Sequence, residues 1–286
     1  MTVGTSRVTD LNSYFNNIYE DAVFAVHEQT IATRLVRRFT DGNGDQTRSL
    51  TTYPTITPVS VAETEDFAAP TRFDKSLLAT LTPGEVMSQV LLTDRRLETD
   101  PQNARQDASL ELANGFADKV DQDIFGRFNE LTGGTVGSLG GTMLWGYLYA
   151  AISLLRAGKV PRPYYAVLHP YAWHDLATTA AVAATVTNAP DFQDQVMRNF
   201  YVGSVAGLDG IFVSANVPDS GGTGAYSAVF NPNAIAFDVR RGMRLEPERD
   251  ASARAWELNM SMLYATGVWR PLWGVQILHD ITAPTS

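Results

Sequence analysis

Two histidines and an aspartate lie close together in the stretch HPYAWHD, and these residue types often act in catalysis or metal binding. The side chains of His169, His174 and Asp175 can bind a metal ion or transfer protons. A gap of five residues, however, places the two imidazoles on different faces of a helix, whereas a gap of four would bring them together. We therefore predict structural roles: His169 ends a strand, and His174 packs or forms a hydrogen bond near a helix start.

The glycine-rich stretch GGTVGSLGG, residues 133–141, is a second place where chemistry could occur. It lacks the Gly-Lys-Ser/Thr ending of a phosphate-binding loop, and it follows a predicted helix where that motif follows a strand. The stretch also does not match the Gly-x-Ser-x-Gly motif of a nucleophile elbow, because residue 136 is Val. We interpret the stretch as a flexible hinge.

The acidic residues Glu246, Glu248 and Asp250 could bind calcium or form a carboxylate pair, but they alternate with Pro247 and Arg249. We place them at a hairpin tip, where charged side chains keep a loop in solvent.

The basic residues Arg34, Arg37 and Arg38 could contact DNA through its phosphates. At helical spacing, with Glu28 and Asp41 nearby, they are more typical of a solvated face or a salt-bridged interface.

Three large aromatic residues, Trp256, Trp269 and Trp273, cluster in the last predicted strands. Such amphipathic rings are common both in contacts between subunits and in ordinary cores, and the sequence leaves both interpretations open.

The composition limits the remaining classes of function. The 286 residues are 44% hydrophobic and 19% charged, which is typical of a globular protein. A formal charge of -9 predicts that any contact with nucleic acid is weak or local. The absence of cysteine excludes disulfides, thiolate nucleophiles and zinc-thiolate sites. The N-terminus does not resemble a signal peptide, and no run approaches the roughly 18 apolar residues of a membrane span.

No nucleophile, base and orienting group occur at plausible spacing. We therefore predict no catalytic, cofactor-binding or metal-binding residues and no cofactor, and we do not expect an enzyme. A soluble α/β hydrolase or binding protein with an unrecognised pocket is the weaker alternative.

The N-terminal half of the sequence predicts three extended parts. Apolar residues recur every three or four positions between Leu11 and Phe39, which indicates a helical arm. Prolines within residues 47–97 exclude a central strand and favour a long ribbon. A helix of about thirty residues should then begin at Asp100-Pro101, bury one long face and end at Gly133-Gly134.

The C-terminal half predicts a compact α/β unit followed by a hairpin. The unit contains a helix that stops near Gly158, and it continues with strands and helices in YYAVLHP, YAWHDLA, FQDQVMRNFY and GLDGIFVSANVP and with a strand pair turned at Asn231-Pro232-Asn233. The segments GMRLEPERD and ASARAWELNMSMLYATGVW form the long hairpin, and WGVQILHDI is the last strand.

This order of parts resembles the major capsid protein of tailed bacteriophages, whose fold encapsulin shells share. The resemblance covers essentially the whole chain and rests on layout. Its most specific passages are TTYPTITPVSVAETEDFAAPTRFDKSLLATLTPGE as an extended loop, DPQNARQDASLELANGFADKVDQDIFGRF as a spine helix, and YYAVLHPYAWHDLA, GIFVSANVP and AVFNPNAIAF in an axial domain.

The resemblance implies an α+β fold with four parts. These are an N-terminal helical arm at 1–40; an extended β-hairpin loop at 41–98; a peripheral domain at 99–134 and 236–270 with the spine helix and the long hairpin; and an α/β axial domain at 135–235 and 271–286.

The implied function is that of a major capsid protein: a subunit that self-assembles into the hexamers and pentamers of an icosahedral shell around double-stranded DNA. Its expected partners are its own copies and, in addition, a scaffolding protein, a portal and a decoration protein, with weak non-specific contact with packaged DNA and no membrane. Because Met1 runs straight into the arm, we expect a separate scaffolding protein or none. The expected location is the virion capsid, after assembly in the host cytoplasm.

An encapsulin compartment that holds a cargo enzyme is the alternative within the same fold. In either case, the ribbon has few apolar side chains of its own and should lie across a neighbouring subunit. Deleting residues 52–70 is therefore expected to leave folding intact and to prevent assembly.

Overall fold

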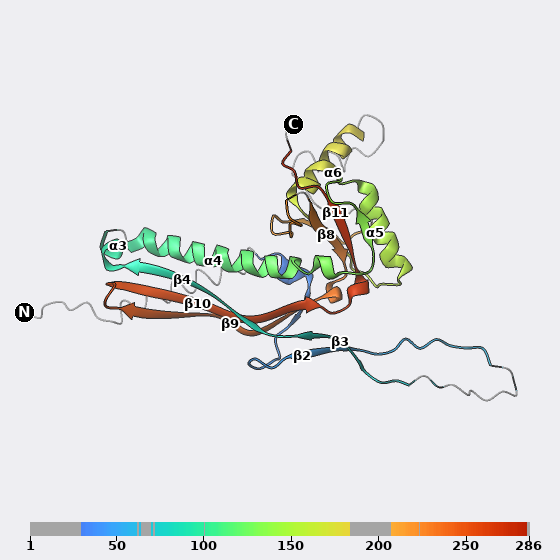
Figure 1. The fold of residues 1–286 in the computed structure, drawn as a ribbon, viewed down its shortest axis with the longest axis horizontal. Helices are drawn as coiled ribbons and strands as arrows, with labels where there is room; N and C mark the ends of the chain where they lie inside the picture. The colour runs from blue at the N-terminus through green and yellow to red at the C-terminus, as the bar shows by residue number, and fades with distance from the viewer. Residues whose placement is uncertain are drawn as a thin grey trace, which may run out of the picture.

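The computed structural model describes residues 30–61, 63, 70, 72–99, 101–183, 207–222 and 224–284. Most of the predicted N-terminal helical arm, the predicted helix at 192–201 and the predicted cap Asp100 lie outside these residues. Within them, the chain forms an elongated body with a four-stranded, a five-stranded and a two-stranded sheet (Figure 1).

The predicted spine helix is present as α4, Pro101–Phe125. Its apolar residues at every fourth position are buried as expected: Ala108, Leu112, Phe116, Val120 and Ile124. The predicted end at Gly133 is wrong, because the helix stops eight residues earlier, before Gly126. A Cβ at Gly126 would lie 2.9 Å from the carbonyl oxygen of Gln122, so this last tight turn requires glycine. A short 3₁₀ turn, Phe128–Glu130, follows.

The four-stranded sheet lies along α4 and contains the predicted long hairpin (Figure 1). Its order is β1-β9-β10-β4, with β1 at Arg37–Phe39, β9 at Ile235–Asp250, β10 at Ala255–Val268 and β4 at Gly84–Thr93. Strands β9, β10 and β4 are antiparallel, and β1 runs parallel to β9. Strand β4, which we assigned to the extended loop, thus forms part of the same sheet as the hairpin.

The predicted helical periodicity through Phe39 is wrong at its end. Residues Ala32–Leu35 form the short helix α2, but Arg37–Phe39 form strand β1. The sheet pairing with β9 and the edge contact between Phe39 and Trp269, whose ring centres lie 5.9 Å apart, override the local helical pattern.

A five-stranded sheet forms the α/β unit. Its order is β5-β11-β8-β6-β7, with β5 at Thr135–Gly137, β11 at Gly274–His279, β8 at Ala225–Phe230, β6 at Tyr165–Leu168 and β7 at Gly210–Val213. Helices α5, Trp145–Ala157, and α6, Pro170–Ala183, belong to this unit (Figure 1). Side chains of both helices share a core with the sheet, which contains Leu148, Ile152, Trp173, Leu176, Val229 and Ile277.

The interpretation of residues 133–141 as a hinge needs correction, because Thr135–Gly137 is the edge strand β5 beside β11. At Gly137, φ is 81° and a Cβ would lie 2.3 Å from the carbonyl oxygen of Leu278. The glycine therefore serves a close backbone approach within a sheet.

The predicted strand pair around Asn231 also needs correction. Both strands exist, but β8 belongs to the five-stranded sheet and β9 to the four-stranded sheet. The 3₁₀ turn Pro232–Ala234 between them is capped by the side chain of Asn231, which accepts a hydrogen bond from the Asn233 amide. This turn thus carries the chain from one unit to the other. Helix α3, Asp94–Thr99, was not predicted.

Strands β2, Arg48–Thr52, and β3, Ser76–Leu81, form the two-stranded antiparallel sheet. The chain beyond these strands projects away from the body (Figure 1). We call β2, β3 and the described residues between them the ribbon. None of the described helices is long and apolar enough to cross a membrane.

The carboxylate of Asp121 joins α2 to the spine helix. Its oxygens accept hydrogen bonds from the backbone amides of Ile31 at 3.4 Å and Ala32 at 3.2 Å. The residue is only 4% exposed. Burial raises its pKa to about 6; the two amides oppose this shift, and nearby Asp118 adds to it.

We expect this carboxylate to make folding stability depend on pH. Because the folded-state pKa of about 6 exceeds the ordinary 3.8, the folded protein holds a proton that the unfolded chain has released between these pH values. The contribution of Asp121 is therefore most favourable below pH 4 and falls as the pH rises through 6, with a loss of about 1 kcal/mol between pH 5 and pH 7. Urea unfolding at both pH values should show a smaller pH dependence in Asp121→Asn than in the wild type. The exposed neighbour Asp118, changed to Asn, should keep most of the wild-type dependence; equal dependence in wild type and Asp121→Asn would contradict the assignment.

Candidate interaction surface

The ribbon exposes apolar side chains that find no cover in its own subunit. Tyr53, Ile56, Val59 and Val61 are between 46% and 67% exposed, and Phe73, Leu77 and Leu78 on the returning strand are also exposed. The chain has enough residues to bury a core, and among the described residues three clusters lie outside the ribbon while a fourth includes only the base of the ribbon. A concentrated group of exposed apolar side chains on a projecting segment therefore marks an interaction surface.

An aromatic pair holds the two sides of the ribbon together beyond the last strand pairing. The rings of Tyr53 and Phe73 stack with centres 4.6 Å apart and planes 7° apart. The ammonium of Lys75 lies 5.7 Å from the centre of the Tyr53 ring. These contacts pre-organise two exposed rings, which reduces the entropy lost when a partner binds them.

Buried charges anchor the base of the ribbon to the four-stranded sheet. The carboxylate of Asp238 on β9 is fully buried and lies 2.7 Å from Nε of Arg48 on β2 and 2.9 Å from a guanidinium nitrogen of Arg240. Arg48 also pairs with the exposed Asp41 at 2.6 Å, and its guanidinium lies over the ring of Phe39 at 4.7 Å. The hydrogen bond to Asp238 is the main cause that raises the pKa of Arg48. The ribbon is thus fixed at its base and exposed beyond it.

A small apolar cluster supports the same anchor. Leu50 of β2 and Leu81 of β3 pack with Ala236 and Ala265 of the four-stranded sheet. Gly267 leaves room for this contact, because a Cβ there would lie 2.5 Å from a methyl group of Leu81.

His169, His174 and Asp175, the candidate acid-base residues for which we predicted structural roles, lie apart from the ribbon, in the five-stranded unit. His169 directly follows β6, and its Nδ1 accepts a hydrogen bond from the Tyr171 amide at 3.2 Å. His174 and Asp175 lie in α6, with Nδ1 of His174 3.9 Å from Oδ1 of Asp175. The second oxygen of Asp175 accepts a hydrogen bond from the Met143 amide, which is a structural role.

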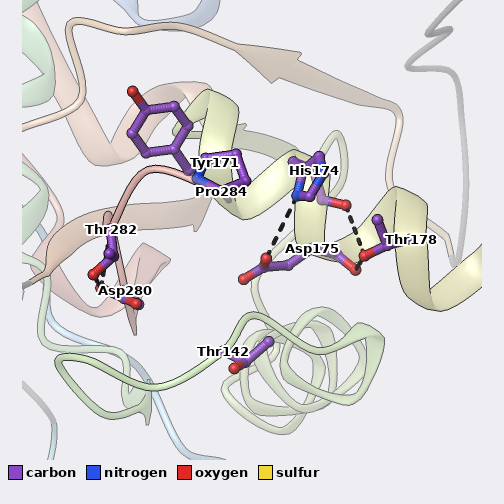
Figure 2. Close-up of a pocket in the computed structure, with 8 residues that line it drawn as sticks. All are labelled: Thr142, Tyr171, His174, Asp175, Thr178, Asp280, Thr282 and Pro284. Atoms are coloured by element: carbon purple, nitrogen blue, oxygen red, sulfur yellow. Dashed lines mark hydrogen bonds and ion pairs between the residues drawn. The ribbon is translucent and has the colours of Figure 1, made fainter. Parts of the chain in front are cut away.

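Figure 2 shows the pocket that His174 and Asp175 line together with residues from the C-terminal segment. It has a volume of 330 Å³, and Asp280 on its other side is held by Thr282. Among the described residues, no three His, Cys, Asp or Glu side chains lie close enough together to hold a metal ion.

Sequence reasoning missed a serine-histidine pair. Nδ1 of His279 donates to the carbonyl of Asp280 at 2.8 Å, so its Nε2 accepts the hydroxyl of Ser227 at 2.7 Å. Burial lowers the pKa of His279. Both side chains are 0% exposed, so a substrate cannot reach them and the pair stabilises the core. The two residues are 52 positions apart in the sequence, and no local pattern indicated the pair.

The prediction that the acidic residues form the hairpin tip needs correction, because Glu246 and Glu248 are paired residues of strand β9 and only Asp250 borders the turn. Glu246 pairs with Arg244 at 2.6 Å. Asp250 accepts hydrogen bonds from the Ser252 hydroxyl and from the backbone amides of Ala253 and Ser252, and these bonds lower its pKa. Glu246 and Glu248 are exposed on the strand, and Asp250 is partly buried beside the turn.

The structure does not bring the three arginines onto one helical face. Arg34 belongs to α2, whereas Arg37 and Arg38 are in β1, and Arg37 lies 5.7 Å from the Phe39 ring. DNA contact by these residues stays a prediction.

The three tryptophans are half-buried and pack against different clusters of the core. Arg270 lies between two of them, 5.0 Å from the Trp269 ring and 4.1 Å from the Trp273 ring. Core packing is therefore present, and an additional role in subunit contacts stays a prediction.

Comparison with protein families identifies the chain. A family model described as phage capsid protein matches residues 88–277. The chain belongs to the phage capsid protein family. Its function is that of a major capsid protein, a structural subunit of the virion capsid, and the ribbon lies before the matched residues. No curated protein matches the sequence.

Solved structures show that this capsid protein has the phage capsid fold, although sequence identity is low. The capsid of cyanophage P-SCSP1u is 15% identical, with 87% of this chain and 88% of that chain covered and a TM-score of 0.67. A Mycobacterium phage Che8 structure is also 15% identical, with 87% and 90% covered and a TM-score of 0.64. The capsid of Helicobacter pylori bacteriophage KHP30 is 12% identical, with 87% and 89% covered and a TM-score of 0.63. The α+β fold class is thus confirmed, and the encapsulin alternative gains no support from these comparisons.

Proposed function

We propose that this capsid protein self-assembles into hexamers and pentamers that close an icosahedral shell around double-stranded DNA, and that the ribbon joins neighbouring subunits. The observation that carries the proposal is the row of exposed apolar side chains on the ribbon, from Tyr53 to Val61. Covering one half-exposed Ile or Val side chain contributes about 1 kcal/mol. A ribbon laid on a neighbour gains this contribution at several positions, and every subunit of a shell repeats it.

Several features of the ribbon suit a partner outside its own subunit. Its base is fixed by Arg48 and Asp238, whereas the described contacts between its two sides beyond Thr52 and Ser76 are the Tyr53–Phe73 stack and Lys75 over the Tyr53 ring. The segment thus keeps its direction and can adjust its shape to a neighbouring surface.

The acidic composition suits the packaging of DNA. With a formal charge of -9, the protein does not neutralise phosphates over a large surface, so contact with DNA is weak and non-specific. We propose no catalytic activity, assembly in the host cytoplasm, and a scaffolding protein, portal and decoration protein as further partners.

We also retain the four-part division as a proposal. The four-stranded sheet with α4 forms the peripheral domain, and the five-stranded sheet with α5 and α6 forms the axial domain. The ribbon is the extended loop, and its boundary with the peripheral domain follows β3, because β4 pairs with β10.

Electron microscopy and light scattering of the purified full-length protein test the assembly. We expect ring-shaped oligomers or closed shells tens of nanometres wide, because a shell contains many copies of the 31.2 kDa subunit. A protein that stays monomeric at high concentration would contradict the proposed function.

A further inference from the structure

Strand β4 forms one edge of the four-stranded sheet. All ten of its residues, Gly84–Thr93, pair with β10 in an unbroken register. On its other side β4 has no strand partner among the described residues. One row of backbone amides and carbonyls is therefore open along the strand.

This edge lacks the features with which soluble proteins prevent edge-to-edge pairing. It contains no proline, no lysine and no bulge. Its one charged side chain, Glu85, pairs back over the sheet with Arg241, and Gln89 likewise donates to Glu257 at 3.0 Å. The apolar side chains Met87 and Leu91 on the same face remain 59% and 52% exposed.

On the face towards α4, the edge is also incompletely covered. Leu258 and Met260 of the neighbouring strand β10 are fully buried, whereas Val86 and Val90 of β4 remain partly exposed. An additional strand beside β4 would extend the sheet and cover apolar side chains on both of its faces.

We propose that β4 pairs antiparallel with β4 of a second copy, around a two-fold axis that passes through Gln89. The reason is that the strand is self-complementary in this register. The opposed residues are Met87 with Leu91, Val86 with Leu92, Ser88 with Val90, and Glu85 with Thr93. Apolar residues thus face apolar or small residues, and no like charges meet.

Other registers fit less well. With the axis at residue 88, Leu91 would face Glu85, and with the axis at residue 90, Met87 would face Thr93. A shift of the pairing by one residue would place outer-face side chains opposite inner-face ones. Only an axis at Gln89 brings Met87 opposite Leu91, so that both exposed apolar side chains of each copy are covered.

The two copies would form one continuous sheet of eight strands, because each contributes four. A two-fold contact of this kind is separate from the ribbon. The β4–β4 contact suits the boundary between two neighbouring hexamers or pentamers. This location in the shell rests on the proposed function, whereas the pairing itself does not.

Disulfide trapping tests the pairing, since the natural chain has no cysteine. In Gln89→Cys, two copies of one residue would face each other on the axis with Cα atoms about 5 Å apart, which suits a disulfide. We expect covalent dimers of the assembled full-length protein under mild oxidation, seen on non-reducing gels. Leu91→Cys alone is the matched control: the Cα atoms of its two copies would lie about 14 Å apart, and they should not link.

A second pair of variants tests the same pairing even if Gln89→Cys fails to fold or assemble. A mixture of Met87→Cys and Leu91→Cys chains, assembled together, should give covalent dimers, whereas each variant alone should not. Shells that form without these links would overturn the pairing and leave the proposed function intact. This outcome is expected if residues 1–29 or another protein cover the edge of β4 instead. Linked dimers that never form larger particles would support the pairing and contradict the shell. Links of equal yield at all three positions would also overturn the proposed register.

Discussion

A variant in which residues 54–72 are replaced by Asn-Gly is expected to fold into the native body and to form no closed shells. The replacement is possible because the rings of Tyr53 and Phe73 stack at 4.6 Å, so the two ends of the removed segment lie close together. Ile56, Val59 and Val61 in the removed segment are exposed, and exposed positions contribute little to subunit stability. Circular dichroism and urea unfolding should therefore resemble those of the wild type, while electron microscopy shows no shells.

Point variants separate the apolar contact from the length of the ribbon. Changing Ile56, Val59 and Val61 to Ser removes about 1 kcal/mol of burial per side chain, roughly a hundredfold loss for each ribbon contact. The matched control changes exposed polar neighbours in the same segment, Thr55, Thr57 and Ser60, to Ala. Assembly lost in the first set and kept in the second is the expected result. Normal shells from the Ser variant would show that these side chains are not the contact.

The second large effect is expected at the buried anchor of the ribbon. Asp238→Ala leaves the guanidinium groups of Arg48 and Arg240 without their buried carboxylate. Breaking a buried ion pair on one side costs about 3–5 kcal/mol, because the remaining charge stays desolvated. Urea unfolding should show this loss, and limited proteolysis should cut near β2 and β3 more rapidly.

Asp41→Ala is the matched control for this anchor, since Asp41 binds the same arginine but its side chain is 75% exposed. An exposed ion pair contributes about 0–1 kcal/mol, so this variant should be nearly as stable as the wild type. Similar losses in the two variants would mean that burial of the Asp238 pair does not determine the anchor.

The sequence was sufficient to predict the order of parts, because local chemistry marks them. Apolar residues at every fourth position and the Asp-Pro start indicated α4, and two runs on either side of a polar tip indicated the β9–β10 hairpin. The exposed ribbon followed from its prolines and its few apolar residues. These features depend on neighbours in the sequence, which is why a single chain reveals them.

Features that depend on distant residues were not predictable in the same way. Strand β1 exists because β9, some 200 residues later, pairs with it, and Asp238 meets Arg48 across 190 residues. The turn at Pro232–Ala234 looked like a hairpin because its local chemistry is the same whether the next strand joins the same sheet or another. The Ser227–His279 pair and the open edge of β4 likewise appear only when the sheets are assembled.

An electron cryomicroscopy reconstruction of the assembled particle tests the central claim most directly. The account predicts that Tyr53, Ile56, Val59 and Phe73 of one subunit lie buried against a neighbouring subunit. A particle in which these side chains remain in solvent, or fold back onto their own subunit, would contradict it.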